Sequence, residues 1–195
     1  MIDEFEDTCI REEWITCLVS SVNSKSKVNI AIDELEGVWA MFATRKKDGK
    51  RLVYEVGHST NIRKELNKNI NRMYKNTNIQ YGYFSNEKAF EWLDKLDCKY
   101  QTLIKEYTDI TIYRINISQF LVSESVSTIL ARIDFGSINK IALAEILFAY
   151  LSKAICWHPG PKPRASNRDE QELINLEASE ETLAFKLKQL NELNM

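Results

Sequence analysis

The sequence has little of what marks a metal-binding or strongly charged protein. Its four cysteines, Cys9, Cys17, Cys98 and Cys156, are scattered without a CxxC pair, and no histidine lies near them at the spacing of zinc ligands. We therefore expect four reduced, mostly buried thiols. The net charge is only −2, which excludes a general attraction to nucleic acid, so any such binding needs a local basic face.

Long hydrophobic runs are also missing. The most apolar segment, residues 141–157, contains Glu145 and Lys153 and is shorter than the ~20 apolar residues that a membrane span requires. It predicts a buried helix, and no membrane partner is expected. The first residues, MIDEFEDTC, are acidic and hold no apolar signal core, so we expect a cytoplasmic location.

The composition that remains is typical of a globular domain. The chain has 195 residues, of which 44% are hydrophobic and 28% charged, enough for one full core with an appended arm or tail. We expect a helical arm over residues 1–35, a core over 36–167 and a helical tail over 168–195. Leucines spaced by three and four residues in the tail predict a helix that either forms a homodimer or packs back on its own domain.

Hydrophobic periodicity predicts an α/β or α+β fold with a small, mostly antiparallel sheet flanked by helices. An Asp-Gly turn at 46–50 indicates a β-hairpin at its centre. The expected elements are a helix at 8–22, strands at 28–32, 38–44 and 51–56, a helix at 61–73, a strand at 79–84, a helix from 85 to 96, a strand at 108–115 and a helix at 137–156.

Glu145 is the most informative single residue, because it lies in a helix that is apolar almost all round. A buried carboxylate is costly unless a cation or hydrogen bonds compensate it. One interpretation is a ligand of Mg²⁺, which keeps much of its water shell and needs few protein ligands. The other is a salt bridge to a neighbouring lysine or arginine.

The order of the core elements resembles that of the GIY-YIG nuclease family, over roughly residues 36–167. The matching positions are Gly37-Val38-Trp39 for the Gly-Ile-Tyr motif, Glu55-Val56-Gly57 for Tyr-Ile-Gly, Asn61-Ile62 for the common Asn-Leu, Glu145 for the metal-binding Glu, and Pro163 with Asn167 for the closing Pro-x-x-Asn.

The resemblance implies two tyrosines that serve the attacking water, a helix arginine that neutralises the phosphate, and a Glu that holds one divalent metal. This chain departs from the family at both tyrosine positions and at the arginine position. Trp39 has no titratable hydroxyl, and Glu65 stands at the arginine position, where a carboxylate repels phosphate. Tyr54 is a stand-in for the second tyrosine, but it is expected to face away from Glu55 unless a β-bulge turns it.

Other residues near the motif are candidates for catalysis. His58 is a general base or phosphate ligand, or else a cap or surface residue. Arg63 is the nearest arginine on the helix, although it projects from the other edge of the apolar stripe. Glu55 and Glu65 are candidate additional metal ligands.

A local basic face would let the acidic chain contact phosphates. The alternative is ordinary solvated side chains. The candidate residues for nucleic-acid binding are Lys46, Lys47, Lys50, Lys64, Lys68, Arg72 and Asn167.

Three functions follow from these observations. The first is a GIY-YIG-like domain that has lost catalysis and binds nucleic acid or a protein. The second is a divergent Mg²⁺-dependent endonuclease that hydrolyses phosphodiester bonds in DNA, with Tyr54 or His58 acting beside Glu145. The third is an accidental likeness, with an interaction module that uses the C-terminal helix.

Overall fold

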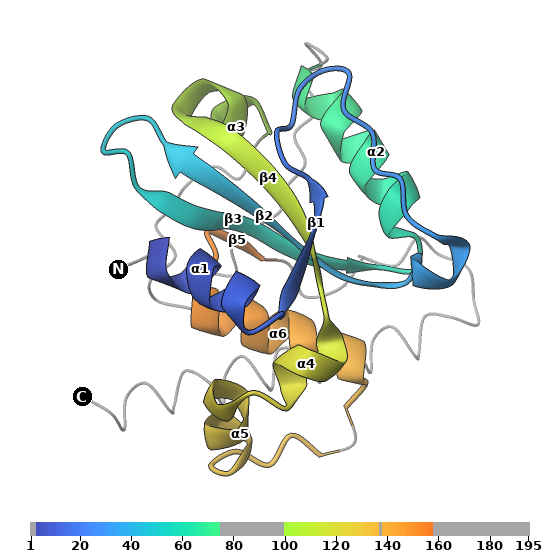
Figure 1. The fold of residues 1–195 in the computed structure, drawn as a ribbon, viewed down its shortest axis with the longest axis vertical. Coiled ribbons are helices and arrows are strands. Elements are labelled where there is room, and N and C mark those ends of the chain that lie inside the picture. Colours follow the sequence, from blue (N-terminus) through green and yellow to red (C-terminus); the bar gives the residue numbers. More distant parts are fainter. Residues whose placement is uncertain (1–2, 75–99, 137, 158–195) are drawn as a thin grey trace, which may run out of the picture.

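A computed structural model describes residues 3–74, 100–136 and 138–157 (Figure 1). The elements, in chain order, are α1 (Asp3–Arg11), β1 (Ile15–Val19), the 3-10 helix η1 (Ile32–Glu34), β2 (Gly37–Arg45), β3 (Arg51–Ser59), α2 (Ile62–Tyr74), α3 (Tyr100–Glu106), β4 (Tyr107–Ile115), α4 (Ile117–Leu121), α5 (Glu124–Leu130), α6 (Lys140–Ser152) and β5 (Cys156–Trp157).

One mixed sheet organises these elements, with strand order β1-β4-β2-β3-β5. Strand β2 is central and pairs antiparallel with both β3 and β4, β1 pairs antiparallel with β4, and β5 runs parallel to β3. The predicted α+β class with a mostly antiparallel sheet is confirmed. So are the hairpin, the helix that follows it and the strand at 108–115.

The hairpin turn has the chemistry that its Asp-Gly sequence predicts. Gly49 has a φ of 69°, in the left-handed region that glycine adopts without strain. Asp48 accepts hydrogen bonds from the Arg45 guanidinium and from the Lys50 backbone N–H. These local bonds fix the turn, and the turn sets the pairing of β2 with β3.

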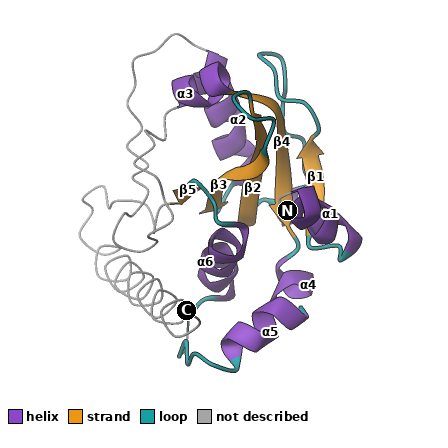
Figure 2. Ribbon diagram, turned by 90° about the vertical axis from the view of Figure 1, so that its left-hand side faces the viewer, coloured by secondary structure: helices purple, strands orange, loops and turns teal. Residues whose placement is uncertain are grey.

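Helices cover both faces of the sheet (Figures 1 and 2). Helices α1, α4, α5 and α6 pack on one face, where Val38, Ala40 and Phe42 of β2 point, and α2 and α3 pack on the other, against Trp39 and Met41. We name these the α6 face and the α2 face. Because neighbouring residues of β2 point to opposite apolar layers, neither side of this strand is polar.

Two predictions in the N-terminal part are wrong. A helix over 8–22 is not formed, because α1 ends at Arg11 and Glu13 has a left-handed φ of 57°. The β-branched residues after it form β1, so the expected arm contributes an edge strand to the sheet. The segment predicted as a strand at 28–32 is not a strand, and the 3-10 helix η1 begins at its last residue.

The helix that carries Glu145 is shorter than predicted. Asn139 caps α6 by accepting a hydrogen bond from the Ile141 N–H, and Lys153 ends it in the left-handed conformation. Cys156 then belongs to β5, and it is disulfide-bonded. The prediction of four reduced thiols is therefore wrong at Cys156.

Several predictions lie outside the described residues. They are the strand at 79–84, the helix from 85 to 96, the tail over 168–195 with its dimerisation, and Asn167. Among the helices described, none is long and apolar enough to cross a bilayer.

Candidate functional site

The candidate site lies where β3 leads into α2, and a β-bulge shapes it. Met41 of β2 pairs with Glu55 and Phe42 with Val53, so Tyr54 is an extra residue in β3. Tyr54 belongs to the core on the α2 face, and Glu55 faces the same side as its partner Met41. The bulge that the Tyr54 hypothesis required is therefore present, and it turns two successive side chains toward α2.

Trp39 and Gly57 form a cross-strand pair two residues beyond the Met41–Glu55 pair at the bulge. The indole lies so close to Gly57 that a Cβ there would be 2.7 Å from Cζ2 of Trp39. Gly57 is thus required for packing, because any side chain would collide with the ring. The indole is almost fully buried, yet its N–H has no hydrogen-bond partner.

Glu65 lies in the first turn of α2 and faces this pair. Burial raises its pKa, and the nearby Ser59, His58 and Lys68 only partly offset that effect. The Trp39 N–H also lowers the pKa slightly, although it forms no hydrogen bond of normal geometry. A carboxyl group, not a cation, therefore occupies this part of the site.

Glu55 lies deeper, under α2 and α3, and is only 4% exposed. Burial raises its pKa to about 8, with a further contribution from the negative charge of Glu65. The nearby Tyr100 hydroxyl lowers the pKa in part, and the Oε2 atom of Glu55 has no hydrogen-bond partner among the described residues. Near neutral pH, Glu55 holds a proton that an exposed glutamate would have lost.

Glu145 finds a partner that was not predicted. His58 is the last but one residue of β3, and its Nδ1 atom contacts the Glu145 carboxyl of α6. Burial raises the pKa of Glu145, while the side chain and the backbone N–H of His58 lower it in part. The prediction that Glu145 needs a partner is confirmed, but the partner is a histidine rather than a lysine or arginine.

The geometry does not offer a prebuilt Mg²⁺ site. The Glu145 carboxyl already accepts hydrogen bonds from His58, and Mg²⁺ demands near-octahedral oxygen ligands. No group of three or more His, Cys, Asp or Glu side chains is arranged to hold a metal within the described ranges. The His58 ring occupies the Oε2 atom of Glu145, so a metal would have to use the other carboxyl oxygen or displace the ring.

The remaining catalytic candidates do not meet His58 and Glu145. Tyr54 is buried in the α2-side core, where its ring packs edge-on against Tyr107 at 5.1 Å between centroids. Arg63 is half-buried on α2.

The candidate basic residues fall into two separate groups. Lys47 and Lys50 are exposed at the hairpin turn, and Lys46 Nζ donates to the Ile104 and Lys105 carbonyls at the end of α3. Lys64 and Lys68 are exposed on α2, with Arg72 half-buried in its last turn. The turn and the start of α2 lie at opposite ends of β3, so the lysines of the turn and those of the first turns of α2 do not form one patch (Figure 1).

Sequence reasoning missed three polar residues on the α2 face. Tyr100 contacts Glu55, and no signal in the sequence pointed to it. Asn69 is 1% exposed with an unpartnered amide nitrogen. It interrupts the apolar stripe of α2 one turn after Glu65, a signal that could have been used. Arg114 pairs with Trp39 across the sheet and reaches Glu34 at 2.9 Å.

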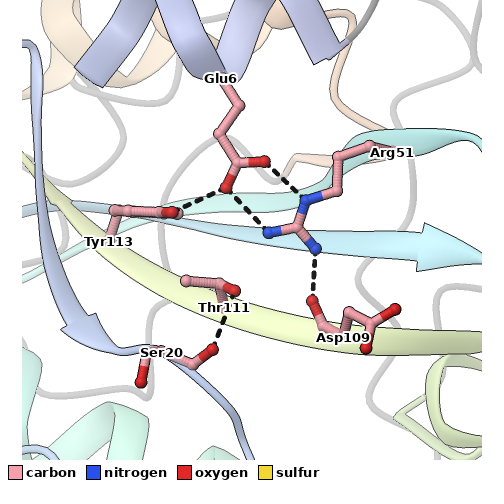
Figure 3. Close-up of polar contacts among 6 residues, drawn as sticks. All are labelled: Glu6, Ser20, Arg51, Asp109, Thr111 and Tyr113. Carbon is pink, nitrogen blue, oxygen red and sulfur yellow. Dashed lines mark hydrogen bonds and ion pairs between the residues drawn. The ribbon is translucent and has the colours of Figure 1, made fainter. Parts of the chain in front are cut away.

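A second charged cluster, which is half-buried, lies on the α6 face (Figure 3). Glu6 of α1 accepts two hydrogen bonds from Arg51 of β3, at 2.6 and 2.8 Å, and one from the Tyr113 hydroxyl at 2.7 Å. Arg51 also donates to the Asp109 carbonyl and lies over the Phe42 ring. The contacts of Glu6 join α1 to the sheet, and those of Arg51 with Asp109 and Phe42 join strands within it, which indicates a structural role.

No family model, curated protein or solved structure matches the chain.

Proposed function

We propose that this chain is a GIY-YIG-like domain that does not hydrolyse phosphodiesters and serves as a binding module for nucleic acid or a protein. The observation that carries the proposal is Glu65, whose carboxyl faces Trp39 at the position where the family places its phosphate-neutralising arginine. The order of β2, β3, α2, β4 and α6, with β2 between β3 and β4, supports the family likeness.

The electrostatics of the site oppose phosphodiester chemistry. Hydrolysis develops negative charge on the phosphate, and losing one stabilising donor typically costs about 3–4 kcal/mol of transition-state stabilisation. Here the nearby acidic groups are Glu55, Glu65 and Glu145. Burial raises the pKa of each, and the negative charge of Glu65 raises the pKa of Glu55 and of Glu145 further. A phosphate would add to that repulsion.

The second candidate is a divergent Mg²⁺-dependent DNA endonuclease. The contact of His58 with Glu145 favours it, because a carboxylate that orients an imidazole is a common arrangement for a general base. This function would need Glu145 both to hold His58 and to bind the metal.

A cleavage assay separates the two functions. Purified full-length chain is incubated with single- and double-stranded DNA and RNA in Mg²⁺ or Mn²⁺, beside the Glu145→Gln variant. We expect no cleavage above the level of the variant. Metal-dependent cleavage that the variant abolishes would overturn the proposal in favour of the endonuclease.

A further inference from the structure

The α2 face holds two carboxyl groups without a cation. Glu55 and Glu65 lie on β3 and α2, close enough for the charge of one to raise the pKa of the other. Neither forms an ion pair within the described part of the chain. Lys68 is near Glu65 but exposed, so the pair lacks the cation that buried acidic groups normally have.

Unpartnered polar atoms point into the same place. The Oε2 atom of Glu55 and the Nε1 atom of Trp39 have no hydrogen-bond partner, although these residues are 4% and 1% exposed. Leaving a buried polar atom unsatisfied costs about 1–3 kcal/mol, and such atoms are rare in native proteins. Trp39 and Glu55 are each close enough to Glu65 to interact with it, which indicates a site that something else completes.

Exposure differs along the site. Glu65, Ser59 and His58 are half-buried where β3 leads into α2, whereas Glu55 and Trp39 are buried. Glu65 is therefore the carboxyl of the pair that solvent reaches more easily.

The chemistry of the lining selects a donor with positive charge. Carboxyl oxygens dominate, so an anion is repelled and a cation is attracted. A metal ion needs a larger set of oxygen ligands than the described residues bring together. An ammonium or guanidinium group brings its own N–H donors, which form charge-assisted hydrogen bonds with carboxylates.

We infer that the site between Glu55 and Glu65 binds an organic cation, namely an ammonium or guanidinium group of a small molecule or of a lysine or arginine side chain. This inference rests on the proposed function, because it names the ligand class of the same site. Binding pairs the cation with the half-buried Glu65 and with the buried Glu55, which releases its proton to solvent as the cation binds.

Calorimetric titration of the full-length chain with agmatine, which carries both cationic groups, tests the inference. We expect binding that weakens at least about tenfold in Glu65→Gln and in Glu55→Gln, since each removes a charge-assisted hydrogen bond. Glutamine has nearly the shape of a protonated glutamate, so both variants should fold. Glu12→Gln, at an exposed position beyond α1, makes the same charge change and should bind as the parent chain does.

A second readout does not depend on the variants. The Trp39 indole N–H resonance, assigned with Trp39→Phe, should shift when agmatine is added to the parent chain. A glycine peptide with one central arginine distinguishes the sources of the cation: tighter binding than agmatine assigns a protein partner, and weaker binding assigns a small molecule.

Two results would overturn the inference. One is the absence of both heat and shift with agmatine and with the peptide at millimolar concentration. The other is agmatine binding that the two Gln variants retain in full. The cleavage assay separates this failure from failure of the proposed function: without cleavage the binding module stands and only the ligand class is lost.

Discussion

The two faces of the sheet treat buried charge in opposite ways. On the α6 face, Glu6 meets Arg51 and Tyr113 in a closed set of hydrogen bonds (Figure 3). Burial alone would raise the pKa of Glu6, but these bonds outweigh it and the pKa lies below its ordinary value. On the α2 face, no ion pair within the described residues gives Glu55 or Glu65 such a cation, and the pKa of each is raised.

The difference distinguishes charged groups that stabilise the fold from charged groups that are left for a ligand. A satisfied ion pair fixes α1 on the sheet and leaves nothing for a ligand to complete. Buried carboxyls without a cation destabilise the fold, and strongly perturbed pKa values cluster at functional sites. The α2 face is therefore where we place the function, and three measurements on stability can break or sharpen this distinction.

The largest effect is expected from Arg51→Met. It leaves Glu6 half-buried without its cation, and removing one partner of a buried pair typically costs about 3–5 kcal/mol. Urea denaturation should show a loss of this order in the free energy of unfolding. The double variant with Glu6→Gln should recover part of it, because the uncompensated carboxylate is then gone.

Arg45→Met is the matched control, since Arg45 pairs with Asp48 in an exposed turn. Exposed pairs contribute about 0–1 kcal/mol, so the loss should be much smaller than for Arg51→Met. Equal losses in the two variants would contradict a special role for the network on the α6 face.

The second effect concerns pH and Glu55. Its pKa is raised to about 8 in the folded chain, against about 4.3 in an unfolded one. Between these values the folded state binds more protons, so the free energy of unfolding falls as pH rises. Glu55→Gln removes this dependence. Relative to the parent chain, the variant should gain a few kcal/mol in urea denaturation between pH 5 and pH 8.

The groups that face Glu55 are Glu65 and Tyr100. Glu65 is also an acid with a raised pKa, so its own titration likewise makes the free energy of unfolding fall as pH rises. Glu106→Gln makes the same charge change at an exposed position of α3 and should not give the gain of a few kcal/mol expected for Glu55→Gln, because it removes no buried carboxyl. A pH-independent difference for Glu55→Gln would contradict an uncompensated carboxyl.

The fold was predictable where local patterns determine it. The Asp-Gly turn predicted the hairpin, the apolar stripe predicted α2, and the β-branched run TDITIYRI predicted β4. Helical spacing near the N-terminus gave a wrong prediction. The same spacing of Ile10, Trp14 and Leu18 is compatible with a helix that ends before Glu13 and is followed by the strand β1.

The site was predictable only by position along the chain. The apolar helix around Glu145 predicted that this carboxyl has a partner. That the partner is His58 depends on how α6 crosses the end of β3, which no local pattern encodes. The contact of Tyr100 with Glu55 likewise joins two distant elements. The sequence showed that Tyr54 needs a β-bulge to face the same side as Glu55. It did not show that the bulge exists, because the bulge follows from the pairing of β3 with β2.

The smallest effect is expected from Gly57→Ala, which tests how tightly the α2 face is built. The new Cβ would lie 2.7 Å from the Trp39 ring, and overpacking of this kind typically costs about 1–3 kcal/mol. Trp39→Leu in the same chain should relieve the clash, so the cost of Gly57→Ala in that background should fall close to zero. Gly136→Ala, where nothing lies within 4 Å but φ is +61°, should show a backbone cost that Trp39→Leu leaves unchanged. If Gly57→Ala lowered the free energy of unfolding equally in the Trp39→Leu background, the indole would not be what requires glycine at position 57. The requirement would then be assigned to the backbone conformation.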